Sequence, residues 1–267
     1  PFGTYSQWVK LANGDLYLFY RHGSHRSDWV YQKSVDDGRT FAPEVSVLKS
    51  KVSSFSRTTV DAWYAWFDNG RGDTITAHYI YHPCANPGHT TMRSNAYYML
   101  MNCRDGSWTN AQGAAVSVPV TKEDADQTTM IWNSGKEKFN HGTAHVDAEG
   151  RPHLYVRTRG VLYFRWLGNS WQDPVPVQVA GKGKAHDGDF IIESPTRIRM
   201  LMDHAEDGVG EVGWWNSSDG GMTWAKGPAL ISSKTSTFET TAFVRNAHPD
   251  ARMLIAEKTR NQEHLYH

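Results

Sequence analysis

Ser34-Val35-Asp36-Asp37-Gly38-Arg39-Thr40-Phe41 and Ser217-Ser218-Asp219-Gly220-Gly221-Met222-Thr223-Trp224 are two copies of one pattern, Ser-x-Asp-x-Gly-x-Thr-aromatic. Each copy follows a strand-like run, residues 29–33 before the first and 211–215 before the second. In such a turn the Asp accepts hydrogen bonds from the backbone, the Gly supplies a positive φ, and the aromatic ring packs back between strands. The pattern therefore predicts the same turn at the ends of two strands in distant parts of the chain.

This turn is similar to the Asp box that closes a hairpin in sialidase-like β-propellers. Alternating apolar and aromatic runs, separated by Asn-Gly, Asp-Gly and Glu-Gly turns, divide the chain into five units. Each complete unit holds three strands and a turn leading to a fourth, as in a four-stranded propeller blade. No segment of convincing length has helical periodicity. The units cover about residues 5–48, 57–120, 139–178, 185–231 and 238–267.

We therefore predict an all-β fold, a β-propeller of four-stranded blades with about five blades visible. The last unit lacks a box and an outer strand. Either the N-terminal strand closes this blade, or residues 1–267 form a single propeller domain that is part of a longer one, and we favour the second. The alternative is a β-sandwich, against which the boxes in register with hairpins argue.

Composition excludes several classes of function. The 28 Lys and Arg residues equal the 28 Asp and Glu residues, so net charge favours neither nucleic acid nor an anionic membrane. No apolar run is long enough to span a bilayer, and no signal peptide is visible. The chain opens on Pro1 without Met, as a processed or trimmed product would. The 11 Trp and 12 Tyr residues are suited to plugging blades and to stacking on sugar rings.

The two cysteines, Cys84 and Cys103, lie near opposite ends of one expected hairpin, formed by residues 73–82 and 94–103. A strand rises about 3.4 Å per residue, so they would lie roughly 30 Å apart and form no disulfide. No cofactor is required by any pattern. A structural zinc or calcium ion is conceivable near His82, Cys84 and His89, but no motif with fixed metal-ligand spacing supports it.

The third unit is the richest in groups that could carry chemistry. Its first expected strand contains two imidazoles on one face, and its second contains two guanidinium groups on one face. An imidazole near a guanidinium indicates an anionic group between them, and a substrate carboxylate would satisfy both. The structural alternative is pairing with neighbouring acids or with the backbone. The candidates are Asn140, His141, His145, Arg157 and Arg159.

The second unit contributes His78 and His82 on one strand face and Tyr98 on the next strand. His82 and Tyr98 meeting across a hairpin could act as a general acid/base pair, whereas the structural alternative is an ordinary half-buried aromatic strand. In the first unit, Arg21 begins a basic loop that either contacts an anionic polymer or is simply solvated. A P-loop, a GxGxxG fingerprint, a GxSxG elbow and an HExxH helix are all missing from the sequence.

The opening Tyr5-Ser6-Gln7-Trp8, followed by residues 13–21, resembles the first blade of the BNR-repeat polysaccharide lyases, the ulvan lyases and related rhamnosyl-glucuronate lyases. The resemblance runs along most of the chain. It implies a seven-bladed propeller that cleaves next to a uronic acid by β-elimination. It also implies two His on the second blade and, on the third, a Tyr and an Arg sixteen residues apart. His141 and Arg157 have that spacing, with His in place of Tyr. His82 matches the first blade-two histidine, and Tyr98 stands near the second.

The resemblance implies that Arg157 binds the uronate carboxylate and that His141 is base or acid, with His82 and Tyr98 assisting. His145, Arg159, Arg21, His78 and Asn140 would contact substrate. We expect a secreted or periplasmic monomer with an anionic polysaccharide as substrate, and no nucleic-acid or membrane partner. Two other functions stay open, a sialidase-type glycoside hydrolase and a non-catalytic sugar-binding propeller. A lyase alone would leave an unsaturated sugar.

Overall fold

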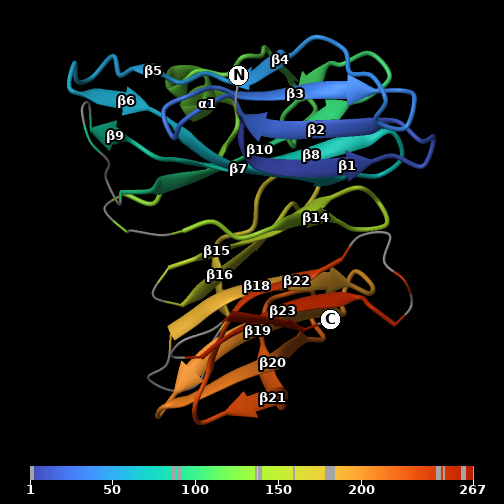
Figure 1. Cartoon of the computed structure of the whole chain (residues 1–267), viewed down its shortest axis with the longest axis vertical. Coiled ribbons are helices and arrows are strands. Elements are labelled where there is room, and N and C mark those ends of the chain that lie inside the picture. Colours follow the sequence, from blue (N-terminus) through green and yellow to red (C-terminus); the bar gives the residue numbers. More distant parts are fainter. Residues whose placement is uncertain are drawn as a thin grey trace. The chain divides into compact units, whose positions relative to one another are not determined.

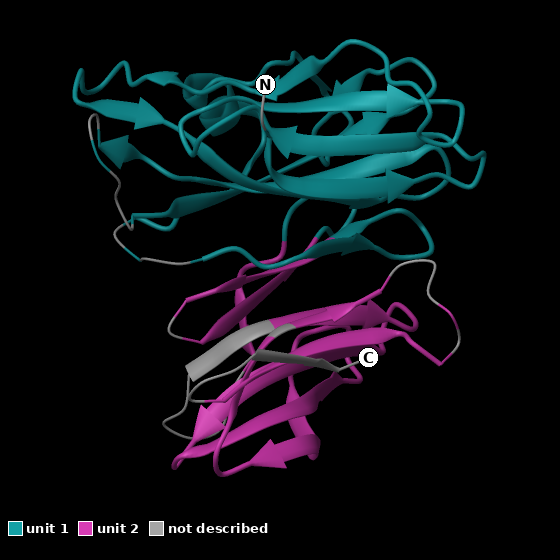
Figure 2. Ribbon diagram, in the orientation of Figure 1, with its two compact units in different colours: residues 1–152, 166–171 teal, residues 153–165, 172–267 magenta. Residues whose placement is uncertain are grey.

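The computed structural model of the protein (Figure 1) describes residues 3–85, 88, 92–135, 137, 140–158, 160–177, 184–244, 248, 250–259 and 263–266. For residues 184–187, 240 and 263–266 it describes the backbone alone. The described residues divide into two compact units (Figure 2), residues 1–152 with 166–171, and residues 153–165 with 172–267. That residues 1–267 form a single propeller domain stays a prediction.

The first unit is built from antiparallel sheets. One sheet has the order β1-β2-β3-β4, and a second runs β12-β11-β10-β8-β7, with β13 also pairing with β10. A small third sheet has the order β5-β6-β9. The strands are β1 (Thr4–Lys10), β2 (Leu16–Arg21), β3 (Trp29–Ser34), β4 (Val45–Leu48), β5 (Lys51–Val52), β6 (Thr59–Asp61), β7 (Trp63–Asn69), β8 (Thr74–Tyr81), β9 (Cys84–Ala85), β10 (Ser94–Asn102), β11 (Trp108–Thr109), β12 (Ala115–Val116), β13 (Met130–Trp132) and β14 (Ala144–Val146).

The second unit continues the same pattern of neighbouring antiparallel strands. Strands β15, β16 and β17 pair in that order, as do β18-β19-β20-β21 and then β22-β23-β24. The last of these sheets has three strands, as expected for the incomplete fifth unit. The strands are β15 (Pro152–Arg157), β16 (Val161–Arg165), β17 (Val175–Val177), β18 (Lys184–Ile192), β19 (Ile198–Glu206), β20 (Val209–Ser217), β21 (Ala225–Ser233), β22 (Thr237–Phe243), β23 (Met253–Lys258) and β24 (Glu263–Tyr266).

Both predicted box turns have the expected hydrogen bonds. Asp36 accepts from the Thr40 backbone at 2.8 Å and from the Thr40 hydroxyl at 2.6 Å. Asp219 accepts from the Thr223 backbone at 2.9 Å and from its hydroxyl at 2.5 Å. These bonds to the threonine, above all that of its hydroxyl, lower the pKa of each carboxyl to about 2. At Gly221 (φ +91°) an added Cβ would lie 2.1 Å from the Tyr163 ring, so the turn requires glycine.

One helix was not expected from the sequence. Helix α1 (Lys122–Thr128) is only seven residues long, too short for a periodic pattern to be read. Its start carries a capping box, in which the Thr121 hydroxyl accepts from the Asp124 backbone and the Asp124 carboxylate accepts from the Thr121 backbone. The Thr-x-x-Asp spacing was the available signal. The hairpin predicted around the cysteines is confirmed by the pairing of β8 with β10, and Cys84 and Cys103 are both buried and form no disulfide with each other.

The core of the first unit fixes the strand that carries the candidate site. Phe67 on β7 stacks on Phe19 with the ring centroids 3.9 Å apart. Gln7 on β1 donates to the Ala65 carbonyl at 2.8 Å and accepts from the Phe67 N–H at 2.9 Å. The side chain of Gln7 thereby replaces a strand partner for β7 and holds that strand in register. Trp63, Ala65 and Phe67 face this core.

Candidate active site

The opposite face of β7 carries the candidate site. Side chains alternate along a strand, so Tyr64, Trp66 and Asp68 point away from the core that holds their neighbours. The rings of Tyr64 and Trp66 are nearly parallel, with centroids 6.4 Å apart. Tyr64 is 8% exposed, whereas Trp66 is half-buried. Around these two rings lie groups from several other elements of the same unit, and we name this arrangement the Tyr64–Trp66 surface.

Arg21, at the end of β2, lies at the Tyr64 end of this surface. Its guanidinium carbon is 4.8 Å from the centroid of the Tyr64 ring and 4.7 Å from that of Tyr5. One of its nitrogens donates to the Trp63 carbonyl at 3.2 Å. The side chain is 1% exposed, and among the described residues no carboxylate pairs with it. Burial therefore lowers the pKa of Arg21, and the cation, held by two aromatic faces, favours an anion nearby.

Arg93 and His82 also approach Tyr64. The Arg93 guanidinium carbon lies 4.7 Å from the ring centroid of Tyr64, and the His82 ring lies 5.0 Å from it. His82 Nδ1 is 2.8 Å from the Met92 carbonyl, which fixes the orientation of the imidazole. His82 is fully buried, so it is placed to support Tyr64 and not to touch a polymer directly. This differs from the expectation that His82 takes part in the proton transfer.

His141 lies at the Trp66 end of the surface. Its ring stacks on Trp66 with a centroid distance of 3.9 Å and an interplanar angle of 15°. Its Nδ1 is 2.9 Å from the Asn140 side-chain oxygen, which also accepts from the His141 backbone at 3.0 Å. Both His141 and Asn140 are half-buried. His141 is thus the imidazole at this surface that combines a fixed orientation with partial exposure.

His145 has a structural role in this arrangement. The expectation that it shares a strand face with His141 is wrong, because β14 begins only at Ala144. His145 is 9% exposed, and its Nδ1 lies 2.8 Å from Asp68 Oδ2. A buried imidazole paired with an internal carboxylate fixes β14 against β7. We therefore do not place His145 among the groups that contact substrate.

Tyr98 does not meet His82 across the hairpin as expected. It lies in register with His78, which in turn lies in register with Trp66. Tyr98 is 2% exposed, and burial raises the pKa of its hydroxyl. The Tyr98 ring contacts Trp171 and lines a pocket outside the Tyr64–Trp66 surface. His78 is fully buried below Trp66, so contact of His78 with substrate is also not supported.

His78 makes stability depend on pH. Burial lowers its pKa to about 4, although Nδ1 lies 3.1 Å from the Tyr97 carbonyl. In the unfolded chain its pKa is about 6.5. The unfolded state therefore binds the proton first as pH falls, and stability is lost between about pH 6.5 and pH 4, at up to about 1.4 kcal/mol per pH unit.

We expect His78→Gln to reduce this loss of stability in acid by about 3 kcal/mol, because glutamine keeps a donor for the Tyr97 carbonyl but does not titrate. The free energies of unfolding of the wild type and of His78→Gln are measured by denaturant unfolding at intervals from pH 7 to pH 4. His248→Gln, at an exposed position, is the matched control and should follow the wild type. Equal loss of stability in the wild type and in His78→Gln would show that folding does not lower the pKa of His78.

Arg157, one of the two arginines expected as site residues, belongs to the second compact unit. Arg157 is the last residue of β15, half-buried and in register with Val161. Its proximity to His141 stays a prediction. Arg159 lies outside the described residues. Among the residues described, no group of three or more His, Cys, Asp or Glu side chains could hold a metal ion, and His89 lies outside them. In the described part of the chain, no helix is long and apolar enough to cross a membrane.

The sequence reasoning missed the two rings at the centre of the site. Tyr64 and Trp66 stand in an aromatic run, Trp63-Tyr64-Ala65-Trp66-Phe67, whose alternation marks two faces but not which face is open. Arg93 was likewise not singled out as a site residue. Only the packing of Phe67 and Trp63 into the core shows that Tyr64 and Trp66 face the other way.

The BNR repeat-containing family matches residues 3–176 of this chain. The chain belongs to this family. The ulvan lyase of Pseudoalteromonas sp. (strain PLSV) is 41% identical over 283 residues, covering 98% of this chain and 57% of the relative. The ulvan lyase of Nonlabens ulvanivorans is 37% identical over 279 residues, covering 96% and 57%. The BNR-repeat chain thus spans little more than half the length of the curated relatives it matches.

Comparison with solved structures also shows similarity to ulvan lyases. A PL25 ulvan lyase, solved also bound to -[GlcA(1-4)Rha3S]-, matches 100% of this chain and 64% of its own with a TM-score of 0.92 and 39% identity. The polysaccharide lyase Uly1 has 13% identity and a TM-score of 0.65, which shows a shared fold alone. The predicted propeller-type all-β fold and the resemblance to the ulvan lyases are confirmed. The number of blades stays a prediction.

Proposed function

We propose that this BNR-repeat chain acts as a polysaccharide lyase that cleaves next to a uronic acid by β-elimination, on an ulvan-like or rhamnose–glucuronate polymer. The observation that carries the proposal is the Tyr64–Trp66 surface in a chain 41% identical to an ulvan lyase. That surface joins two neighbouring aromatic rings with the buried cation Arg21 and the oriented imidazole of His141.

The reaction has clear requirements. A base removes the proton on C5 of the uronate, the electron pair forms the C4=C5 double bond, and the C4–O bond breaks. The leaving oxygen then receives a proton from an acid. Positive charge near the carboxylate stabilises the developing enolate, and base and acid must lie within hydrogen-bond reach of C5 and the leaving oxygen. We assign His141 as base or acid and Arg157 as the carboxylate partner, with His82 supporting Tyr64.

The product tests the proposal. The chain is incubated with ulvan and with a neutral polysaccharide, and the conjugated double bond of an unsaturated uronate is followed by ultraviolet absorbance. Absorbance that rises with ulvan alone supports a lyase. New reducing ends without absorbance would show a hydrolase, and polymer binding without either product would show a sugar-binding propeller.

Arg21 gives a test of the electrostatics of the surface. We expect Arg21→Met to lower kcat/KM for the polymer about tenfold, through a higher KM, because the buried cation attracts the anionic chain without touching it. The melting temperature should not fall much, since methionine fills the space and removes an uncompensated buried charge. Arg104→Met, at an exposed ion pair with Asp73, is the control and should leave KM unchanged. An unchanged KM in Arg21→Met would remove Arg21 from the site.

A further inference from the structure

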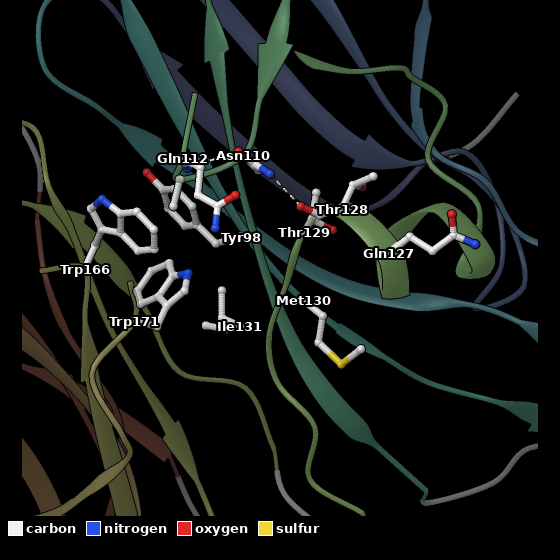
Figure 3. A pocket seen from close by; sticks show the side chains of 11 residues that line it. Tyr98, Asn110, Gln112, Gln127, Thr128, Thr129, Met130, Ile131, Trp166 and Trp171 are labelled. Atoms are coloured by element: carbon white, nitrogen blue, oxygen red, sulfur yellow. Dashed lines mark hydrogen bonds between the residues drawn. The ribbon is translucent and has the colours of Figure 1, made fainter. Parts of the chain in front are cut away.

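A second pocket lies in the first unit, beside the outer strands of the β7–β12 sheet. Its volume is about 160 Å³. A cavity needs only about 10–15 Å³ to hold one water, so this pocket has room for a small organic molecule. Figure 3 shows its side chains, which come from β10, the turn between β11 and β12, the segment from α1 to β13, and the turn of residues 166–171. The lining residues are Tyr98, Asn110, Ala111, Gln112, Gln127, Thr128, Thr129, Met130, Ile131, Trp166 and Trp171.

The chemistry of the lining is uncharged. It combines amides, hydroxyls, aromatic rings and the apolar side chains of Ala111, Met130 and Ile131, and the described residues that line it include no Asp, Glu, Lys, Arg or His. A carboxylate or sulfate entering the pocket would lose its hydration without gaining a cation, which is costly. The lining therefore selects for a neutral molecule, whereas the Tyr64–Trp66 surface, with Arg21 and Arg93, favours an anion.

Two polar side chains at one end of the pocket are available to a ligand. The Tyr98 hydroxyl is buried and makes no hydrogen bond with any described residue. Leaving such a group unpaired costs about 1–3 kcal/mol. Gln112 is exposed beside it, as Figure 3 shows. Asn110 is not available in this way, because it donates to the Thr128 carbonyl at 2.9 Å and accepts from the backbone of Gln112 and Ala114.

Two tryptophans form the wall beside Tyr98, at the same end of the pocket (Figure 3). The rings of Trp166 and Trp171 meet edge to face, with centroids 5.6 Å apart, and Trp171 meets Tyr98 in the same way at 5.7 Å. The turn that carries them is fixed, because Trp166 and Trp171 form a β-bridge and the Leu167 N–H donates to the Ser170 carbonyl at 2.9 Å. Rigid indole faces beside hydrogen-bonding groups are suited to the apolar face and the hydroxyls of a sugar ring.

We propose that this pocket is a second carbohydrate-binding site, which holds one neutral sugar residue beside the Trp166–Trp171 pair, with its hydroxyls toward the polar groups of Tyr98 and Gln112. It is distinct from the Tyr64–Trp66 surface. Tyr98 on β10 lies in register with His78 on β8, and His78 with Trp66 on β7. Two strand spacings, about 10 Å, and the fully buried His78 therefore separate the two sites. Such a site would bind a neutral sugar residue independently of cleavage.

Binding of small neutral glycosides tests the proposal without any need for turnover. The full chain is titrated with methyl α-L-rhamnoside, methyl β-D-xyloside and methyl β-D-glucuronide, and binding is followed by tryptophan fluorescence and by saturation-transfer NMR. We expect at least one neutral glycoside to bind with a Kd on the order of millimolar and the glucuronide to bind more weakly in this pocket. Tyr98→Phe, which removes only the hydroxyl, should weaken binding about fivefold to tenfold.

Further variants make the result decisive. Gln112→Ala, on an exposed turn, should weaken binding to a similar extent, and Trp171→Ala should abolish it. Trp8→Ala is the matched control, since Trp8 is 57% exposed and packs on Phe41 away from the pocket. The proposal is overturned if no neutral glycoside binds, or if Tyr98→Phe and Gln112→Ala bind as the wild type does. It is equally overturned if the glucuronide competes for the same pocket with equal affinity. None of these outcomes depends on lyase activity.

Discussion

His141→Gln is expected to lower the rate of unsaturated uronate formation by about 10²–10⁴-fold, the range that a positioned acid or base contributes. His141 stacks on Trp66 at 3.9 Å, and its Nδ1 lies 2.9 Å from the Asn140 side-chain oxygen, so the imidazole is held in one orientation at this surface. Glutamine retains a hydrogen-bonding side chain of similar length but has no group that titrates near neutral pH. The loss should therefore fall on kcat, with a smaller change in KM.

The measurement is initial-rate absorbance on ulvan across a range of pH. The pH–rate profile of the wild type should contain a limb that reflects the titration of an imidazole. This limb should be missing from the pH–rate profile of the residual activity of His141→Gln. His248 is exposed and lies far from residue 141 along the chain, so the control variant His248→Gln should retain full activity. If His141→Gln keeps kcat within a few-fold of the wild type, with an unchanged pH profile, His141 is neither the acid nor the base.

Arg157→Ala is expected to lower kcat/KM by about 10²–10³-fold, the usual cost of removing one group that stabilises developing negative charge. Without a cation at the carboxylate, the enolate formed after loss of the C5 proton is not neutralised. Arg157 ends β15 and is followed by a tight turn, in which the Thr158 N–H donates to the Gly160 carbonyl at 2.8 Å. The end of a strand is where propeller folds present such groups.

Arg197→Ala is the matched control for this variant. Arg197 lies in the same unit, is exposed, and pairs with Glu193 at 2.7 Å. Both proteins should melt within a few degrees of the wild type, which thermal unfolding followed by circular dichroism checks. Full activity of Arg157→Ala would assign the carboxylate to another cation, and the half-buried Arg93 beside Tyr64 would be the first alternative.

The fold could be predicted largely from local patterns. The box at Ser34–Phe41 is stabilised by hydrogen bonds within eight residues, so its turn is encoded where it occurs. The pairing of β8 with β10 could be predicted from strand alternation, because a hairpin joins segments that are close along the chain. Helix α1 and the small β5-β6-β9 sheet escaped prediction because their segments are too short to show a period.

The site could be predicted only in part. Residue types and spacing identified Arg21, His82 and His141, and the structure brings these three to the Tyr64–Trp66 surface. The same reasoning did not distinguish His141, which is half-buried, from His78 and His82, which are fully buried. Burial depends on which distant segments pack over a side chain, and the alternation of a strand does not contain that information.

The sequence by itself determined the repeated box turns, the hairpins and therefore the class of fold, because these depend on hydrogen bonds and alternation between residues close along the chain. Only the tertiary structure decided which faces are open. Phe19 and Phe67 stack across two sheets, so Tyr64 and Trp66 lie on the opposite face of β7, where they meet Arg21 and His141. The pocket of Tyr98, Gln112 and Trp171 likewise exists only because segments far apart in sequence pack together. Side-chain burial is a property of those non-local contacts, so no local pattern could have specified it.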